Sequence, residues 1–198
     1  MAQEGGATAE VSTRELESLA AQGAFACVFD FCTQELGNHL NGSNISAGAD
    51  RLTHAGEKGI PQIVAPGCYD LVDVVGWQPI ADKWSEHLQH AHNRLLTSIV
   101  LNTEEREEVA RAHCVQLAKA KGPTALILPV GGCGEWDRPG ADLHDAEGLA
   151  AFIAAMRDGC PGNVDLHEID AHINDAAFAE KALEIFDRWD REGLVRQP

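Results

Sequence analysis

The sequence predicts a single α/β domain built on an open, mostly parallel sheet with helices on both faces, a Rossmann-like three-layer fold. Apolar runs of strand length alternate along the chain with amphipathic segments of helical length. The runs are apolar at successive positions, which is typical of strands buried between two helical layers. No linker, repeat or low-complexity tract divides the 198 residues. We therefore expect one domain over residues 12–198, preceded by a flexible segment over residues 1–11.

Strands are expected wherever a short apolar run ends in a turn signal. The first run, FACVFDFC, is interrupted only by Asp30, and the second and third runs end in Pro66-Gly67 and Gly131-Gly132. A further stretch, residues 86–101, allows two interpretations, with a strand at 87–92 or at 95–101. The four strands predicted without ambiguity cover residues 25–32, 60–65, 124–130 and 164–169.

Helices are expected between these strands, each placed by a capping residue. Ser12 and Glu15 form a capping-box pattern that predicts a helix to about residue 22, and residues 50–58 predict a short helix. Asn102 opens a helix to about residue 120, and Asp145 opens one to about residue 157. Asn174 or Asp175 caps the last helix, whose apolar face carries Phe178, Ala182, Ile185, Phe186 and Trp189.

Composition excludes several functional classes. The net charge is −16 and the Lys and Arg residues are scattered, which excludes a broad nucleic-acid contact. No apolar run is long enough to span a membrane and the N-terminus has no signal-peptide pattern, so a cytoplasmic protein is expected. The six cysteines lack zinc-site spacing and are expected to be free thiols. Cys68 and Cys133, in glycine-rich loops, are the two to test for reactivity.

Ligands of such folds bind outside the carboxyl ends of the strands, which places the site in residues 31–50, 66–73 and 172–175. Thr33 and Glu35 leave the first strand. Glu35 is a candidate general base, or a ligand for a hydroxyl or a metal, unless Thr33 caps a short helix that has Glu35 in its first turn.

The cluster His87, His90 and His92 could contribute to a metal site only with a further ligand on the same side. The sequence offers no obvious one, so no metal site is predicted.

Two glycine-containing segments follow. Ser46 and Gly48 lie in a run of small residues before a helix, which fits an anion nest with Arg51 as a charged fork, or simply a flexible turn. Gly67 is expected to take a positive φ at a tight strand exit. Asp70, just after it, would orient a polar ligand or cap a helix.

Histidine and asparagine supply the remaining candidates. His172 is the first choice for a titrating group, with a structural histidine as the alternative. Asn174 and Asp175 follow it at the start of the last helix. His92 and Asn93 form a pair at an element end, where His92 is a further acid/base candidate. The glycine-rich segment 131–140 is expected to act as a lid or wall, and its Asp137 is another acid/base candidate.

Several phrases occur here in one order: T-x-E-L, S-A-G-x-D-R-L, G-I-P-Q-I-V-x-P-G-x-x-D, H-N, K-G-P-x-A-x-x-L-P and H-I-N-D-x-x-F-A. Over about residues 12–190 the chain thereby resembles the C-terminal half of the tomato mosaic virus resistance protein-like ATP-binding family. Departures include Arg94, where the family usually has proline. The matching positions are Thr33, Glu35, Ser46, Gly48, Arg51, Gly67, Asp70, His92, Asn93, His172, Asn174 and Asp175.

The resemblance implies a two-lobed α/β protein that binds ATP, with Mg²⁺ as a potential companion, and that forms oligomers. It also implies an N-terminal lobe or partner subunit outside this chain. The leading expectation is a domain that binds a nucleotide or another phosphorylated or carboxylated small molecule together with that lobe. One alternative is a hydrolase or lyase of small-molecule catabolism that uses His172, His92 and Glu35 as acid/base groups. The other is a protein-interaction module without a ligand.

Overall fold

A central parallel sheet organises the computed structural model, which describes residues 9–195. Its strands are β1 (Val28–Cys32), β2 (Gln62–Gly67), β6 (Thr124–Pro129) and β7 (Asp165–Ile169), in the order β1-β2-β6-β7. All three neighbouring pairs are parallel. The four predicted strands and the α/β fold class are confirmed.

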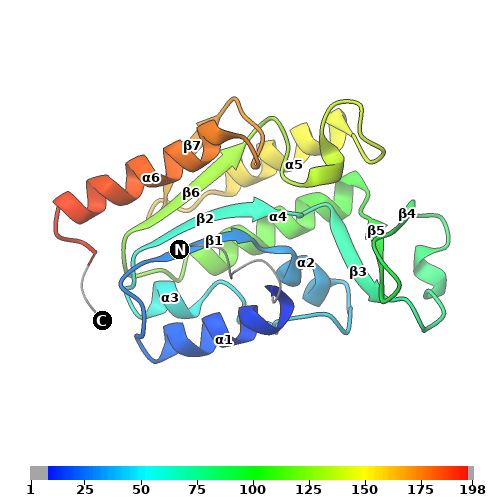
Figure 1. Ribbon diagram of the computed structural model, residues 1–198, viewed down its shortest axis with the longest axis horizontal. Coiled ribbons are helices and arrows are strands. Elements are labelled where there is room, and N and C mark those ends of the chain that lie inside the picture. The colour runs from blue at the N-terminus through cyan, green and yellow to red at the C-terminus, as the bar shows by residue number, and fades with distance from the viewer. Residues whose placement is uncertain (1–8, 196–198) are drawn as a thin grey trace.

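Helices cover both faces of this sheet (Figure 1). On one face α4 (Thr103–Leu117) and α5 (Ala146–Gly159) pack on Val64 and Leu126, and on the other α6 (Ala176–Arg191) packs on Ile63 and Ile127. Both sets of side chains are buried, as the continuous apolar runs predict. The remaining helices are α1 (Ala9–Ala21), α2 (Gln34–Leu40) and α3 (His54–Glu57), with short 3₁₀ turns at Asp82–Trp84 and Glu135–Asp137.

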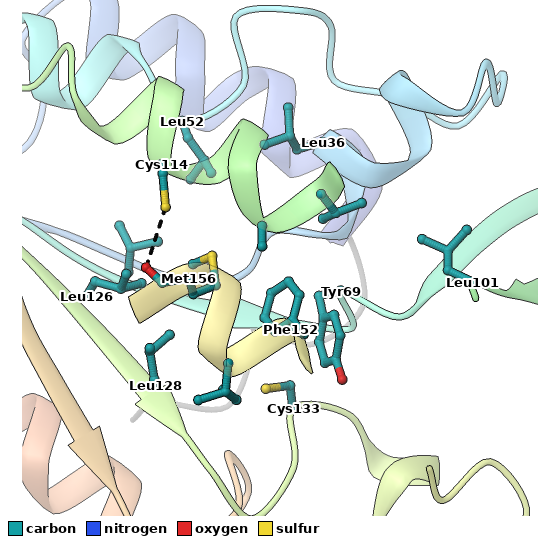
Figure 2. Packing of buried hydrophobic residues seen from close by; sticks show 14 of the residues in the cluster. Leu36, Leu52, Tyr69, Leu101, Cys114, Leu126, Leu128, Cys133, Phe152 and Met156 are labelled. Carbon is teal, nitrogen blue, oxygen red and sulfur yellow. Dashed lines mark hydrogen bonds between the residues drawn. The ribbon is translucent and has the colours of Figure 1, made fainter. Parts of the chain in front are cut away.

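The larger core lies under α4 and α5 and contains the chain's one tyrosine (Figure 2). The rings of Tyr69 and Phe152 stack with their centroids 3.6 Å apart, and Cys133 lies close by. The Cys114 thiol, on α4, donates a weak hydrogen bond to the Met156 carbonyl on α5, 3.7 Å away. Tyr69 is therefore a core residue, and its ring is not available to a ligand.

A second, antiparallel sheet projects from one end of the domain, with the order β3-β5-β4 (Figure 1). It consists of β3 (Leu71–Val75), β4 (Gln89–Ala91) and β5 (Leu96–Val100). Both interpretations of residues 86–101 are thus correct, because the two strands pair with one another. The sequence prediction missed β3, whose Asp73 is buried and accepts a 2.6 Å hydrogen bond from the Ser98 hydroxyl on β5.

Helix caps explain most of the helix starts. Asn102 and Glu105 form the reciprocal capping box at α4, with hydrogen bonds of 3.1 and 2.8 Å. The Asp145 side chain accepts from the Gly148 amide at α5, 2.9 Å away. Asp175 is the N-cap residue of α6, but its side chain makes no capping bond to that helix. The predicted caps at α4 and α5 are confirmed.

Two predicted helix starts differ from the structure. Helix α1 begins at Ala9, so Ser12 lies inside the helix and is not its N-cap. Of the segment 1–11 expected to be flexible, residues 9–11 belong to α1, and residues 1–8 lie outside the described residues. Helix α3 is a single turn in place of the predicted 50–58, because Leu52 takes a left-handed φ of 72° before it. Over the described part of the chain, no helix is both long and apolar enough to cross a bilayer.

Candidate functional site

A small cavity opens where β2 and β6 end, between the central sheet and the antiparallel sheet. Its volume is about 100 Å³. We call it the strand-end pocket. It lies in the position where ligands of parallel α/β sheets bind. Among its lining residues are Cys68, Asp70, His92, Gly134, Trp136 and Asp137.

Asp70 is the most unusual residue of this pocket. Its side chain lies in the pocket wall, the residue is 3% exposed, and its Oδ1 atom has no hydrogen-bond partner among the described residues. Burial raises the pKa of Asp70 from 3.8 to about 6, against an opposing effect of the Arg106 guanidinium. Nearly all buried polar atoms in proteins are hydrogen-bonded. An unpaired carboxylate oxygen in the wall of a cavity is therefore the group expected to receive a ligand's donor.

This pKa predicts an unusual pH dependence of stability. Between pH 3.8 and about 6 the folded state binds more protons at Asp70 than the unfolded state does, so the free energy of unfolding falls as pH rises through that window. We expect Asp70→Asn to be about 3 kcal/mol more stable than the parent at pH 8, with the difference fading near pH 4. Urea denaturation at both pH values measures it. The exposed Asp142→Asn is the control, and an Asp70→Asn variant with no gain at pH 8 would contradict the prediction.

In the glycine-rich loop beside Asp70, backbone amides are hydrogen-bonded to a carboxylate of the same loop. Asp137 Oδ2 accepts hydrogen bonds from the amides of Cys133 and Gly134, at 2.6 and 3.1 Å. Its Oδ1 lies 3.0 Å from His172 Nε2. The amides that would bind an incoming anion are already occupied, so the loop is a fixed wall of the pocket.

His172 holds this wall in place. The residue is buried, and its Nδ1 accepts a 3.1 Å hydrogen bond from the Asn174 amide. The proton therefore lies on Nε2, which is 2.8 Å from the Gly134 carbonyl and 3.0 Å from Asp137. Both ring nitrogens are engaged by groups of the same chain, which leaves neither nitrogen free for a substrate.

Asn174 and Asp175 extend the same connection. Asn174 donates a 2.8 Å side-chain hydrogen bond to Glu135, and Asp175 accepts from the His172 amide at 2.9 Å. Asp175 also pairs with Arg138, 3.2 Å away. The turn after β7 is thus bonded to the loop after β6. Its residues hold that loop in place but do not line the strand-end pocket.

An aromatic rim borders the other side of the pocket. Trp136 packs on His90 and His92, with ring centroids 4.2 and 5.1 Å apart. Asn93 caps the turn between β4 and β5, where its side chain accepts from the amide of Leu95 at 2.7 Å. His92 therefore reaches the pocket, whereas Asn93 shapes the hairpin.

Within residues 9–195, no group of three His, Cys, Asp or Glu side chains is arranged to hold a metal ion.

Glu35 and Arg51 lie elsewhere, in a buried ion network beneath β1. The Arg51 guanidinium, 1% exposed, is hydrogen-bonded to both oxygens of Asp30 and pairs with Glu17 at 3.2 Å and with Glu35 at 3.4 Å. Glu35 also accepts a 2.7 Å hydrogen bond from the Thr13 hydroxyl. Arg51 is thus committed to three carboxylates of its own chain.

This network forms the inner wall of a larger groove of about 760 Å³ between α1 and α6, along β1. The groove is separate from the strand-end pocket, and most of its lining is apolar. Its residues include Leu19, Phe29, Phe31, Glu35, Asn174 and Phe178. The structure therefore divides the predicted site residues between two places.

Thr33 and the segment around Ser46 are internally bonded. The Thr33 hydroxyl donates to His113 Nε2, 2.6 Å away, because the other ring nitrogen of His113 donates to the Val109 carbonyl. Burial lowers the pKa of His113 to about 4, which keeps the ring neutral. The Ser46 hydroxyl accepts from the Gly48 amide at 3.0 Å, so that segment offers a closed turn in place of an open anion nest.

Gly67 is required for a different reason from the one predicted. A Cβ at Gly67 would lie 2.1 Å from the Phe31 carbonyl oxygen on β1, so glycine permits the two strands to approach closely. The positive φ falls on the next residue, Cys68, at 54°.

Cys68 and Cys133 are the two thiols that the sequence selects for a test of reactivity. Cys133 is buried, and that burial raises the pKa of its thiol well above the ordinary value.

Two residues of this region carry no clear functional signal in the sequence. Cys32, at the end of β1, is exposed and touches Cys68, but in the sequence it looks like the last residue of an apolar run. Trp136 gave no signal beyond its place in a glycine-rich loop. Asp137, predicted as an acid/base group, lies four residues after Cys133, a spacing that lets its side chain accept the hydrogen bond from the Cys133 amide within the same loop.

Comparison with known proteins gives the context of this site. A sequence profile described as the uncharacterised protein family (UPF0261) C-terminal domain matches residues 8–189. A UPF0261 protein of Brucella melitensis is 48% identical over 182 residues, which cover 92% of this chain and 44% of the relative. The ToMV resistance protein Tm-1 of Solanum lycopersicum is 25% identical over 178 residues and 24% of its length is covered. The chain spans less than half the length of these relatives.

Proposed function

The chain belongs to the C-terminal domain family of the UPF0261 proteins, and on that premise we propose that it binds a small molecule in the strand-end pocket. The observation that carries this proposal is the buried Oδ1 of Asp70, which has no hydrogen-bond partner in the part of the chain that the structure describes. A carboxylate oxygen accepts hydrogen bonds, so the ligand presents a hydroxyl or amino group to it. The Trp136 ring at the rim supplies a face on which a flat ligand group stacks.

A second lobe completes this site in our proposal. Sites for drug-sized ligands occupy about 300–1,000 Å³, whereas the strand-end pocket holds about 100 Å³, enough for one polar end of a ligand. The relatives carry more than half their length outside the matched region. That additional chain, or a partner subunit, would cover the rest of the ligand at the open side of the pocket.

ATP, which the resemblance implies, fits this pocket only in part. The triphosphate does not fit, because Asp70, Asp137 and Glu135 are all acidic and the loop amides already bind Asp137. Arg51 is buried among carboxylates and offers no charge to a phosphate. One polar end of the nucleoside does fit, since ribose hydroxyls and the adenine amino group are donors. We therefore propose that a nucleotide would place one end of its nucleoside here, against Asp70, and its phosphates, with any Mg²⁺, on the second lobe.

Isothermal titration with adenosine and with ATP–Mg²⁺ tests this proposal. We expect both compounds to bind this domain with similar affinity, and Asp70→Asn to weaken both at least about tenfold, because a hydrogen bond to a buried carboxylate is lost. Asp142→Asn, on the exposed surface, is the matched control. ATP binding far more tightly than adenosine would refute the assignment of the phosphates to the second lobe. No binding of either compound would refute the nucleotide proposal and favour an interaction module.

A second candidate function rests on the pKa of about 6 at Asp70. A carboxyl group that titrates near neutrality suits general acid/base catalysis, and His92 borders the same pocket. The hydrolase or lyase considered from the sequence would then use Asp70 with His92, since Glu35 and His172 are engaged by other groups. For any substrate found, the rate should rise with an apparent pKa near 6 that disappears in Asp70→Asn.

A further inference from the structure

Two cysteines meet in the wall between the groove and the strand-end pocket. Cys32 ends β1 and lines the groove, and Cys68 follows β2 and lines the pocket. Their thiols lie close enough to interact, and this interaction is the largest influence on the pKa of each. Cys32 is exposed, so a reagent in solution can reach the pair.

The backbone brings these two residues to the spacing of a disulfide. Cys32 is paired in register with Gly67, the residue before Cys68. Strands about 4.8 Å apart, with a rise of about 3.3 Å per residue, place Cα atoms offset by one residue about 6 Å apart. Disulfides bridge Cα atoms separated by about 4.4–6.8 Å. No large movement of either strand is needed to join the sulfurs.

The conformation of Cys68 turns its side chain toward Cys32. In extended parallel strands, residues offset by one position project to opposite faces of the sheet. Cys68 has a φ of 54°, a left-handed conformation that costs a non-glycine residue about 1 kcal/mol or more. Its amide is fixed by a 2.9 Å hydrogen bond to the Cys133 carbonyl. This turn sets the two thiols against each other.

We propose that Cys32 and Cys68 are a redox-active pair that closes to a disulfide when a low-molecular-weight disulfide reaches Cys32. With glutathione disulfide, the Cys32 thiolate attacks one sulfur, forms a mixed disulfide and releases one glutathione thiolate. Cys68, after losing its proton to solvent, then attacks the Cys32 sulfur and releases the second glutathione. Two protein thiols are oxidised and one glutathione disulfide is reduced to two thiols.

The roles within the pair follow from the environment of each thiol. The interaction with Cys68 lowers the pKa of Cys32, although partial desolvation of the sulfur and the carboxylates of Glu35 and Asp30 oppose this effect. The same contact, together with burial, raises the pKa of Cys68. Cys32 is therefore the attacking thiolate, since the thiolate is the nucleophilic form, and Cys68 is the resolving thiol.

The remaining cysteines serve as internal references. Cys114 and Cys133 are buried, and Cys27 and Cys160 are half-buried. Burial raises the pKa of all four thiols. Cys27 is the closest match to Cys32, because it directly precedes the same strand.

Peptide mapping of the folded chain after treatment with glutathione disulfide tests the proposal. We expect one intramolecular disulfide, Cys32 to Cys68, and loss of the free thiol at Cys32 at least about tenfold faster than at Cys27. In Cys68→Ser, Cys32 should instead accumulate as the glutathione mixed disulfide. Cys27→Ser should form the bridge as the parent does.

Three results would overturn the proposal. The first is a mixed disulfide at Cys32 that persists although Cys68 is present. The second is oxidation of Cys27 or Cys160 at the rate of Cys32. The third is a Cys32–Cys68 bridge that forms as fast in urea as in the folded chain, which would show that the fold does not prepare the pair.

Discussion

Replacing Arg51 with methionine is expected to lower the free energy of unfolding by about 3–5 kcal/mol, because it leaves buried charges without a partner. Glu17, Asp30 and Glu35 all pair with this guanidinium and are themselves buried. Methionine has a similar length and keeps most of the packing. The loss in the free energy of unfolding therefore measures the effect of removing the positive charge. Urea denaturation at pH 7 measures the change.

Two further variants make this result interpretable. Arg111→Met removes an exposed pair with Glu107, 3.4 Å away, and should change the free energy of unfolding by no more than about 0.5 kcal/mol. Asp30→Asn in the Arg51→Met background should recover part of the loss, because one unpaired charge disappears. If Arg51→Met matches Arg111→Met, the buried network does not stabilise the fold.

Gly67→Ala is the second change with a large expected effect. The added Cβ would lie 2.1 Å from the Phe31 carbonyl oxygen and 3.1 Å from the Cys32 Cα, and both are backbone atoms that cannot rotate away. We expect a loss of about 3 kcal/mol in the free energy of unfolding, at the upper end of the usual range for overpacking. Thermal and urea unfolding both measure it.

The matched control is Gly162→Ala, where an added Cβ meets no atom within 4 Å. That variant should unfold within about 0.5 kcal/mol of the parent. Gly67→Ala should also slow formation of the Cys32–Cys68 bridge, because the ends of β1 and β2 must separate. If Gly67→Ala left the free energy of unfolding unchanged, the ends of β1 and β2 could move apart easily. That result would contradict the close approach of the two strands at Gly67.

The sequence was sufficient to predict the central sheet because each of its strands is an apolar run bounded by a turn. Burial on both faces leaves a signal within a few residues, and so do caps such as Asn102 and Asp145. The antiparallel sheet leaves a weaker signal. Its strands have three to five residues, and Asp73 on β3 is accommodated by Ser98, 25 residues further along the chain. A pairing of that kind is set by tertiary structure.

The location of the site could be predicted, but the availability of each side chain could not. The rule that ligands bind at strand ends selects the loops that contain Asp70 and His92. Whether a polar group is free depends on partners far away in sequence. Arg51 is occupied by residues 16 to 34 positions distant, and His172 by residues 35 and 38 positions distant. Asp70 differs from them because no such partner within residues 9–195 reaches its Oδ1.

The closed loop after β6 has a consequence for ligand selectivity. The Asp137 carboxylate is tethered four residues from the Cys133 amide, so it acts as a built-in competitor at an effective concentration of millimolar or higher. A free phosphate or carboxylate must displace this competitor and also approach a domain with a net charge of −16. The domain is thus biased against anionic groups at this glycine-rich loop, and neutral donors gain access beside it at Asp70.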